Sequence, residues 1–238
     1  MEQDYFNLCD NHFNSEFDNV KSLGRYPWVG INFSRNDHRV LILGDSHYAT
    51  DENGEFCQKE YDNFVNNKES TRNIVNCVIN NVCNGETTWS MFDGLLKTII
   101  DVSPDNVKDF WSKVAFYNFI QEPMKSVNAR PRAKDKKIGW HCLAEVAKII
   151  HPTFILIVGI RNWYGMHVLD EMNIGHELTW DKENSISRTI PAFGRIFFPN
   201  EEIPLAIIHH TSQGYNVNNW REYLHHVVPN VMSFLEKS

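Results

Sequence analysis

The chain has 238 residues, of which 42% are hydrophobic and 22% charged, and these proportions exclude a disordered, collagen-like or coiled-coil protein. Its 23 basic and 30 acidic side chains give a net charge of −7, so contact with nucleic acid has to rest on a local basic patch. The five cysteines form no CxxC pair, no apolar run is long enough to span a bilayer, and no signal-peptide pattern opens the chain. We expect one cytoplasmic domain over 1–238, with free thiols and no membrane contact.

Four short apolar runs predict strands that are buried on both faces, which is typical of a parallel sheet between helices. In chain order they lie at 40–43, 114–117, 154–158 and 205–208. Apolar residues with helical spacing occur at 74–82, 89–99, 140–150 and 217–224, and Pro229 opens a short final helix. These patterns predict an α/β fold, namely a three-layer α/β/α sandwich with a four-stranded, mainly parallel sheet. Residues 176–203 fit the alternation less well and are predicted to form a hairpin.

Polar side chains follow each predicted strand, at the sheet edge where open parallel sheets bind ligands. Asp45 follows the first strand, Asn118 the second, residues 159–162 (GIRN) the third, and His210 the last. Asp45 could cap a helix, or orient water and stabilise a developing cation. Asn118 could satisfy backbone groups or read the polar edge of a heterocycle, and His210 could be structural or catalytic. The convergence of an acid, an amide and an imidazole favours a catalytic site.

One basic cluster lies downstream of Asn118, where we expect it to flank the site. Such a run is usually a solvated loop, but beside a pocket it could hold phosphates. Metal binding has little support because the paired histidines are adjacent and no metal-ligand spacing is present, so we expect no metal. The cluster consists of Lys125, Arg130, Arg132, Lys134, Lys136 and Lys137.

These residues, taken in order, resemble the uracil-DNA glycosylase superfamily, most closely the branch whose first motif reads G-E-A-P-G. The strand and Gly-acid step at 41–45 are similar to that motif, which implies that Asp45 is the water-activating acid. His210-Thr211-Ser212 resembles the H-P-S motif, whose His contacts the departing base. The stretch from Asn118 through Lys125 to Arg130-Pro131 is similar to N-x-x-K-x-R-P with longer spacing.

The resemblance implies roles for further residues and a specific reaction. Tyr48 matches the Tyr that limits the base at its C5 position, and Phe56 is the candidate for the stacking aromatic. The implied base-binding set is Asn118, Tyr48, Phe56 and His47, and Ser212 joins Lys125, Arg130, Arg132, Lys134 and Lys136 as DNA-binding residues. The implied protein is a monomer that flips a uracil, or equally a modified pyrimidine such as a hypermodified phage cytosine, out of DNA and leaves an abasic site.

The sequence also departs from this pattern. Ser46-His47 replaces the usual Ala-Pro or Asp-Pro, and Thr211 replaces the Pro of H-P-S. The iron–sulfur cysteines of the branch are missing, so no cluster or other cofactor is expected. The superfamily also resembles glycosylases of phage defence that remove hypermodified pyrimidines, and this sequence could equally be of that kind.

A second resemblance points to a different enzyme class. Residues 43–46 (LGDS) are similar to the first block of the GDSL/SGNH hydrolases, which implies an esterase with Ser46 as nucleophile. That family needs an Asp three residues before its base His, whereas this chain has Ala206 and Glu222 where such an Asp would stand. A nucleic-acid-binding relative without catalytic activity is the third possibility.

Overall fold

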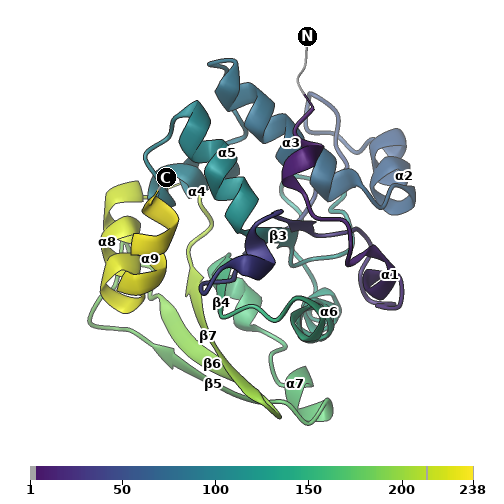
Figure 1. The fold of residues 1–238 in the computed structure, drawn as a ribbon. Coiled ribbons are helices and arrows are strands. Elements are labelled where there is room, and N and C mark those ends of the chain that lie inside the picture. The colour runs from purple at the N-terminus through teal and green to yellow at the C-terminus, as the bar shows by residue number, and fades with distance from the viewer. Residues whose placement is uncertain (1–3, 213, 238) are drawn as a thin grey trace.

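The computed structural model describes residues 4–212 and 214–237, and in that part of the chain the strands form one mixed sheet (Figure 1). The sheet has seven strands in the order β1-β3-β2-β4-β7-β6-β5. The α/β class expected from the sequence is confirmed. The strands are β1 (Trp28–Val29), β2 (Val40–Gly44), β3 (Ala115–Asn118), β4 (Phe154–Val158), β5 (Gly175–Trp180), β6 (Ala192–Phe198) and β7 (Glu201–Ile208).

The four strands expected from apolar runs form the parallel centre of the sheet. β2 pairs in parallel with β3 and β4, and β4 pairs in parallel with β7. The expectation of a four-stranded sheet was nevertheless wrong, because β1 adds antiparallel to β3 and the β5–β6 hairpin adds antiparallel to β7. β1 has only two residues, too few to show any periodicity. A hairpin was expected in this region. The burial of β6 alternates along the strand, which lets β6 pair with β7 and so extends the sheet.

Helices cover both faces of this sheet. Neighbouring strand residues point to opposite sides, so that Ile42 and Leu156 belong to one buried cluster and Leu41 and Ile155 to the other. The first cluster includes side chains of α3, α4, α5, α8 and α9, and the second includes side chains of α1, α6 and α7. The helices are α1 (Asn14–Phe17), α2 (Gln58–Asn66), α3 (Ser70–Cys83), α4 (Ser90–Ile99), α5 (Pro104–Lys113), α6 (Ala133–Ile150), α7 (Val168–Glu171), α8 (Val217–Val227) and α9 (Pro229–Glu236), with 3₁₀ turns η1 (Phe6–Leu8), η2 (Phe33–Arg35) and η3 (Ile160–Trp163).

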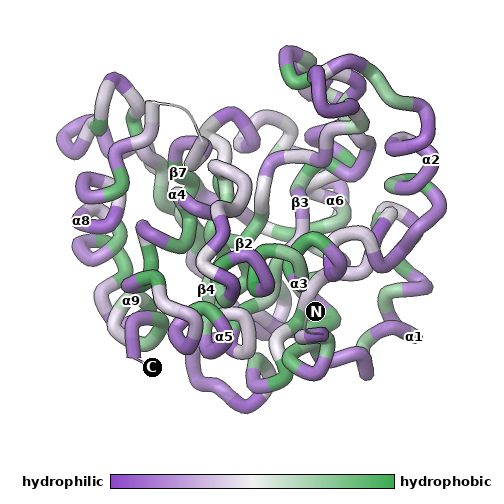
Figure 2. Tube along the Cα trace, turned by 90° about the horizontal axis from the view of Figure 1, so that it is seen from above, coloured by the Kyte–Doolittle hydropathy of each residue, from purple (hydrophilic) through white to green (hydrophobic). Residues whose placement is uncertain are grey.

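Seen from above, α8 and α2 lie on opposite sides of the molecule with β2, β3, β4 and β7 between them (Figure 2). The central strands are apolar throughout, and all five residues of β2 and of β4 are buried. None of the helices in the described ranges is long and apolar enough to cross a membrane. All five cysteines are free.

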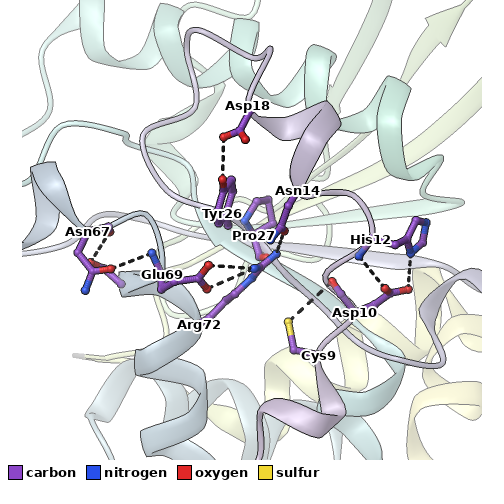
Figure 3. Close-up of polar contacts among 11 residues, drawn as sticks. Cys9, Asp10, His12, Asn14, Asp18, Tyr26, Pro27, Asn67, Glu69 and Arg72 are labelled. Atoms are coloured by element: carbon purple, nitrogen blue, oxygen red, sulfur yellow. Dashed lines mark hydrogen bonds and ion pairs between the residues drawn. The ribbon is translucent and has the colours of Figure 1, made fainter.

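A buried arginine anchors the N-terminal segment to α3 (Figure 3). Arg72 is 1% exposed, and its guanidinium donates to the Asn14 side chain at 2.7 Å and to the Pro27 carbonyl at 2.9 Å. The carboxylate of Glu69 lies 3.2 Å away. Because these partners all come from the chain itself, this charged cluster has a structural role.

Candidate active site

The polar residues singled out after the strands lie along one edge of the sheet. β3, β2, β4 and β7 run in the same direction as neighbours, so their carboxyl ends meet at this edge. Gly44 is the register partner of Asn118, and Val158 is the partner of Ile208. Asp45, Asn118, the 159–162 turn and His210 therefore start from adjacent strand ends.

Asp45 is held in place by an asparagine on the neighbouring strand end. Asn162 Nδ2 donates to Asp45 Oδ1 at 3.0 Å, and Asn162 is 1% exposed. The backbone of Asn162 is fixed independently, because Trp140 Nε1 donates to its carbonyl at 2.8 Å and its own N–H donates to Gly159 O at 2.9 Å. The carboxylate therefore has a preset orientation. Asn162 was missing from the residues assigned to the site, and its position after β4 was the only sequence signal for it.

Gly159 makes this arrangement sterically possible. Its φ is +132°, and a Cβ there would lie 2.8 Å from Asn162 Nδ2 and 3.3 Å from Asp45 Oδ1. An L-residue rarely adopts this backbone conformation. Glycine at this position thus lets the turn after β4 approach the carboxylate closely.

Asn118 lies beside the backbone that leads into Asp45. Phe119 N donates to Gly44 O and Ile120 N donates to Asp45 O, both at 2.9 Å, so the two strand-end loops stay bonded. A Cβ on Gly44 would clash with the amide oxygen of Asn118. That oxygen is buried and finds no hydrogen-bond partner among residues 4–212 and 214–237. An unmet buried acceptor costs about 1–3 kcal/mol, which a ligand N–H could recover.

His210 presents one nitrogen as a donor. Ser212 N–H donates to His210 Nδ1 at 3.3 Å, and Ser212 Oγ lies 2.7 Å from the same nitrogen. A backbone N–H can only donate, so Nδ1 accepts and the neutral ring carries its hydrogen on Nε2. Burial lowers the pKa of His210, although the charge of Asp45 acts to raise it and His209 adds to the lowering. The ring is therefore a neutral Nε2–H donor at pH 7, within electrostatic reach of Asp45.

Helix α4 holds the loop that carries His210. Thr211, which stands where H-P-S has Pro, is 2% exposed, and its Oγ1 donates to Met91 O at 2.6 Å. The Thr211 carbonyl also packs against Gly94, where a Cβ would clash with it. The hydrogen bond and this close packing fix the backbone that follows His210.

The three other predicted base-binding residues lie in different surroundings. His47 is 4% exposed, its ring stacks on Phe64 with centroids 4.7 Å apart, and its Nε2 lies 3.4 Å from Thr71 Oγ1. His47 thus packs against α2 and α3 and takes a core position instead of an open face beside a base. Tyr48 is half-buried and bridged to Met124, and Phe56 is 41% exposed.

The basic cluster divides into engaged and exposed members. Lys136 is 8% exposed, and its Nζ donates to Arg161 O at 2.9 Å. Burial lowers the pKa of Lys136 while Asp45 acts to raise it, which places this cation within reach of the acid. Arg132 forms an ion pair with Asp135 at 3.0 Å. Lys136 was predicted to bind DNA, and in the structure its ammonium donates to a backbone carbonyl and is largely buried. Lys125, Arg130 and Lys134 are exposed.

Ser46 lacks the surroundings of a nucleophile. Its Oγ is buried, and the described part of the chain offers it no hydrogen-bond partner. A serine nucleophile needs a base within hydrogen-bond distance. This geometry does not favour the esterase interpretation.

No protein-family model matches this chain, and no curated protein matches it significantly. The functional argument consequently rests on the geometry of the site.

Proposed function

We propose that the protein is a DNA glycosylase that flips out a uracil or a modified pyrimidine and hydrolyses its N-glycosidic bond, leaving an abasic site. One observation carries the proposal. Asp45, oriented by Asn162, shares a sheet edge with His210, whose neutral ring carries its hydrogen on Nε2. A fixed carboxylate and a fixed donor are what this reaction requires.

The reaction separates charge, and the two groups match the two ends of that separation. As the bond from C1′ to the base nitrogen breaks, the sugar becomes positive and the base becomes negative. Asp45 stabilises the sugar cation and orients the water whose oxygen bonds to C1′, while His210 Nε2–H donates to the departing base. The proton released by the water ends on the base. Preset groups of this kind are each worth about 10²–10³ in rate.

Asn118 is the candidate reader of the flipped base. Its buried amide oxygen lacks a partner in the described ranges, so the N3–H of uracil or the exocyclic amine N–H of a modified cytosine would satisfy it. One good bidentate contact is worth roughly 1–3 kcal/mol of discrimination, against a cost of a few kcal/mol for extruding the base. Such a contact fits both uracil and a modified cytosine, so both remain within the proposal.

The test uses three DNAs of known base content. Purified protein is incubated with uracil-containing, unmodified and hypermodified phage DNA, and abasic sites are then cleaved with alkali. We expect strand breaks in the uracil-containing or the hypermodified DNA and none in the unmodified DNA. Intact strands in all three, together with ester cleavage that is lost in Ser46→Ala, would replace this proposal by the esterase.

A further inference from the structure

A cleft opens beside the turn that holds Asp45. It has a volume of about 280 Å³ and is lined by five large side chains and two smaller uncharged ones. The large ones are Arg161, Trp163, Tyr164, Trp180 and Arg188; we call this the aromatic–arginine cleft. No acidic side chain lines it, so the cleft is locally cationic on a protein whose net charge is −7.

The aromatic side chains form a packed cluster in which Tyr164 is the most exposed ring. Trp163 and Tyr164 are stacked, with centroids 4.1 Å apart and planes 26° apart, and Trp180 meets Trp163 edge-on at 5.4 Å. Tyr164 is 50% exposed. An exposed ring backed by another ring is a surface on which a nucleobase stacks independently of its sequence.

The two arginines are free to bind an anion. Both are exposed, and neither has an ion-pair partner within the ranges that the structure describes. Arg188 lies in a tight turn in which Ile186 and Thr189 exchange backbone hydrogen bonds of 2.8 Å. Ser187 and Arg188 there have φ of 46° and 68°, a left-handed conformation that residues other than glycine rarely adopt. This backbone conformation places Arg188 at the tip of the turn, where it lines the cleft.

The cleft lies next to the residue that binds the proposed catalytic carboxylate. Arg161 and Trp163 flank Asn162, which binds Asp45. Lys136 joins the two regions, because its Nζ donates to Arg161 O at 2.9 Å and lies 4.8 Å from the Tyr164 ring centroid. A nucleotide next to one whose sugar lies at Asp45 would therefore reach the cleft.

We infer that the aromatic–arginine cleft binds an unpaired nucleotide adjacent to the target, with its base stacked on Tyr164 and phosphates held by Arg161 and Arg188. In a duplex the neighbouring base is paired and stacked and cannot enter the cleft. The inference rests on the proposed function and gives it a substrate class, single-stranded DNA.

The first experiment measures binding without excision. A fluorescein-labelled 12-residue oligothymidylate, which contains no uracil or hypermodified base, is titrated by fluorescence anisotropy as a single strand and annealed to oligodeoxyadenylate. The wild type binds the single strand more tightly, and Tyr164→Ala weakens that binding roughly tenfold. Arg161→Gln combined with Arg188→Gln flattens the slope of log K against log salt by about 1.4, which is about 0.7 for each phosphate contact.

Matched controls lie on β6, away from the cleft. Phe197 is 36% exposed and Arg195 pairs with Glu202 at 3.0 Å, so Phe197→Ala and Arg195→Gln remove an exposed ring and a surface charge elsewhere. Both controls bind the oligonucleotide like the wild type. Equal binding of single strand and duplex, or an unchanged affinity in Tyr164→Ala, overturns the inference.

The excision assay separates this result from the proposed function. If the three test DNAs stay intact while Tyr164→Ala still loses single-strand binding, the glycosylase proposal fails and the cleft remains a single-strand site. If base release occurs equally from single strands and duplexes and is unaffected by Tyr164→Ala, the glycosylase stands and the cleft inference fails.

Discussion

Removing the Asn162 amide tests whether the orientation of Asp45 matters for catalysis. In Asn162→Ala the 3.0 Å bond to Asp45 Oδ1 is lost. The backbone bonds from Trp140 Nε1 and to Gly159 O do not involve the side chain, so the turn keeps its path. The perturbation is thereby confined to the donor that fixes the carboxylate.

The size of the effect follows from the partners of the bond. A hydrogen bond to a charged group is worth about 1.5–3 kcal/mol, and Asp45 is half-buried, so water can replace part of the lost contact. We expect the lower end of that range, which corresponds to roughly a tenfold loss in the excision rate. The free energy of unfolding should fall by about 1 kcal/mol, because the amide is buried.

The assay is single-turnover base release with protein in excess, combined with DNA affinity by anisotropy. Asn106→Ala is the control, since Asn106 Nδ2 donates to Asp101 O at 2.7 Å on an exposed part of α5. We expect the rate to drop in Asn162→Ala alone, with unchanged affinity in both variants. A rate within twofold of wild type in Asn162→Ala would refute the claim that the amide presets Asp45.

Three further predictions concern His210, Asn118 and His47. His210→Ala should slow excision about 10²–10³-fold, the scale for losing one electrostatic stabiliser, whereas His209→Ala should not; the reverse result would shift the catalytic role by one residue. Asn118→Asp should change the accepted base or abolish excision without weakening DNA binding, and unchanged excision with the same preference would exclude Asn118 from base recognition. Burial and then the charge of Arg25 lower the pKa of His47 well below 6.5, so below that pH the unfolded chain binds a proton that the folded chain does not. The free energy of unfolding should therefore fall by about 1.4 kcal/mol per pH unit for this group on acidification. Denaturant titrations at several pH values give the dependence of the free energy of unfolding on pH. This dependence should correspond to one proton fewer in His47→Phe than in the wild type, and identical dependences would contradict the assignment.

The strands of the parallel centre could be predicted because a buried strand in such a sheet needs an unbroken apolar run, as 40–43 and 154–158 have. β1 could not be predicted from two residues, since it depends on pairing with β3. The β5–β6 hairpin was expected, but its addition to the sheet depends on the register between β6 and β7, which no local pattern specifies.

The sequence could predict those parts of the site whose positions depend only on the arrangement of the strands. Asp45, Asn118 and His210 each follow a strand of the parallel centre, so they lie at the same edge of the sheet whatever the order of the strands. Asn162 was noted after the third predicted strand but was given no role, because an asparagine in that position is ordinary until its distance to Asp45 is known. The charge pattern along the sequence did not reveal that Lys136 Nζ reaches the Arg161 carbonyl.

The central claim is that Asp45 drives cleavage of an N-glycosidic bond. The direct measurement is release of free base from uracil-containing and hypermodified DNA, followed by mass spectrometry for the wild type and Asp45→Asn. The account predicts free base and abasic DNA from the wild type, and a release slowed about 10²–10³-fold in Asp45→Asn with unchanged DNA affinity. Absence of free base from every substrate, or release by Asp45→Asn at the wild-type rate, would contradict it.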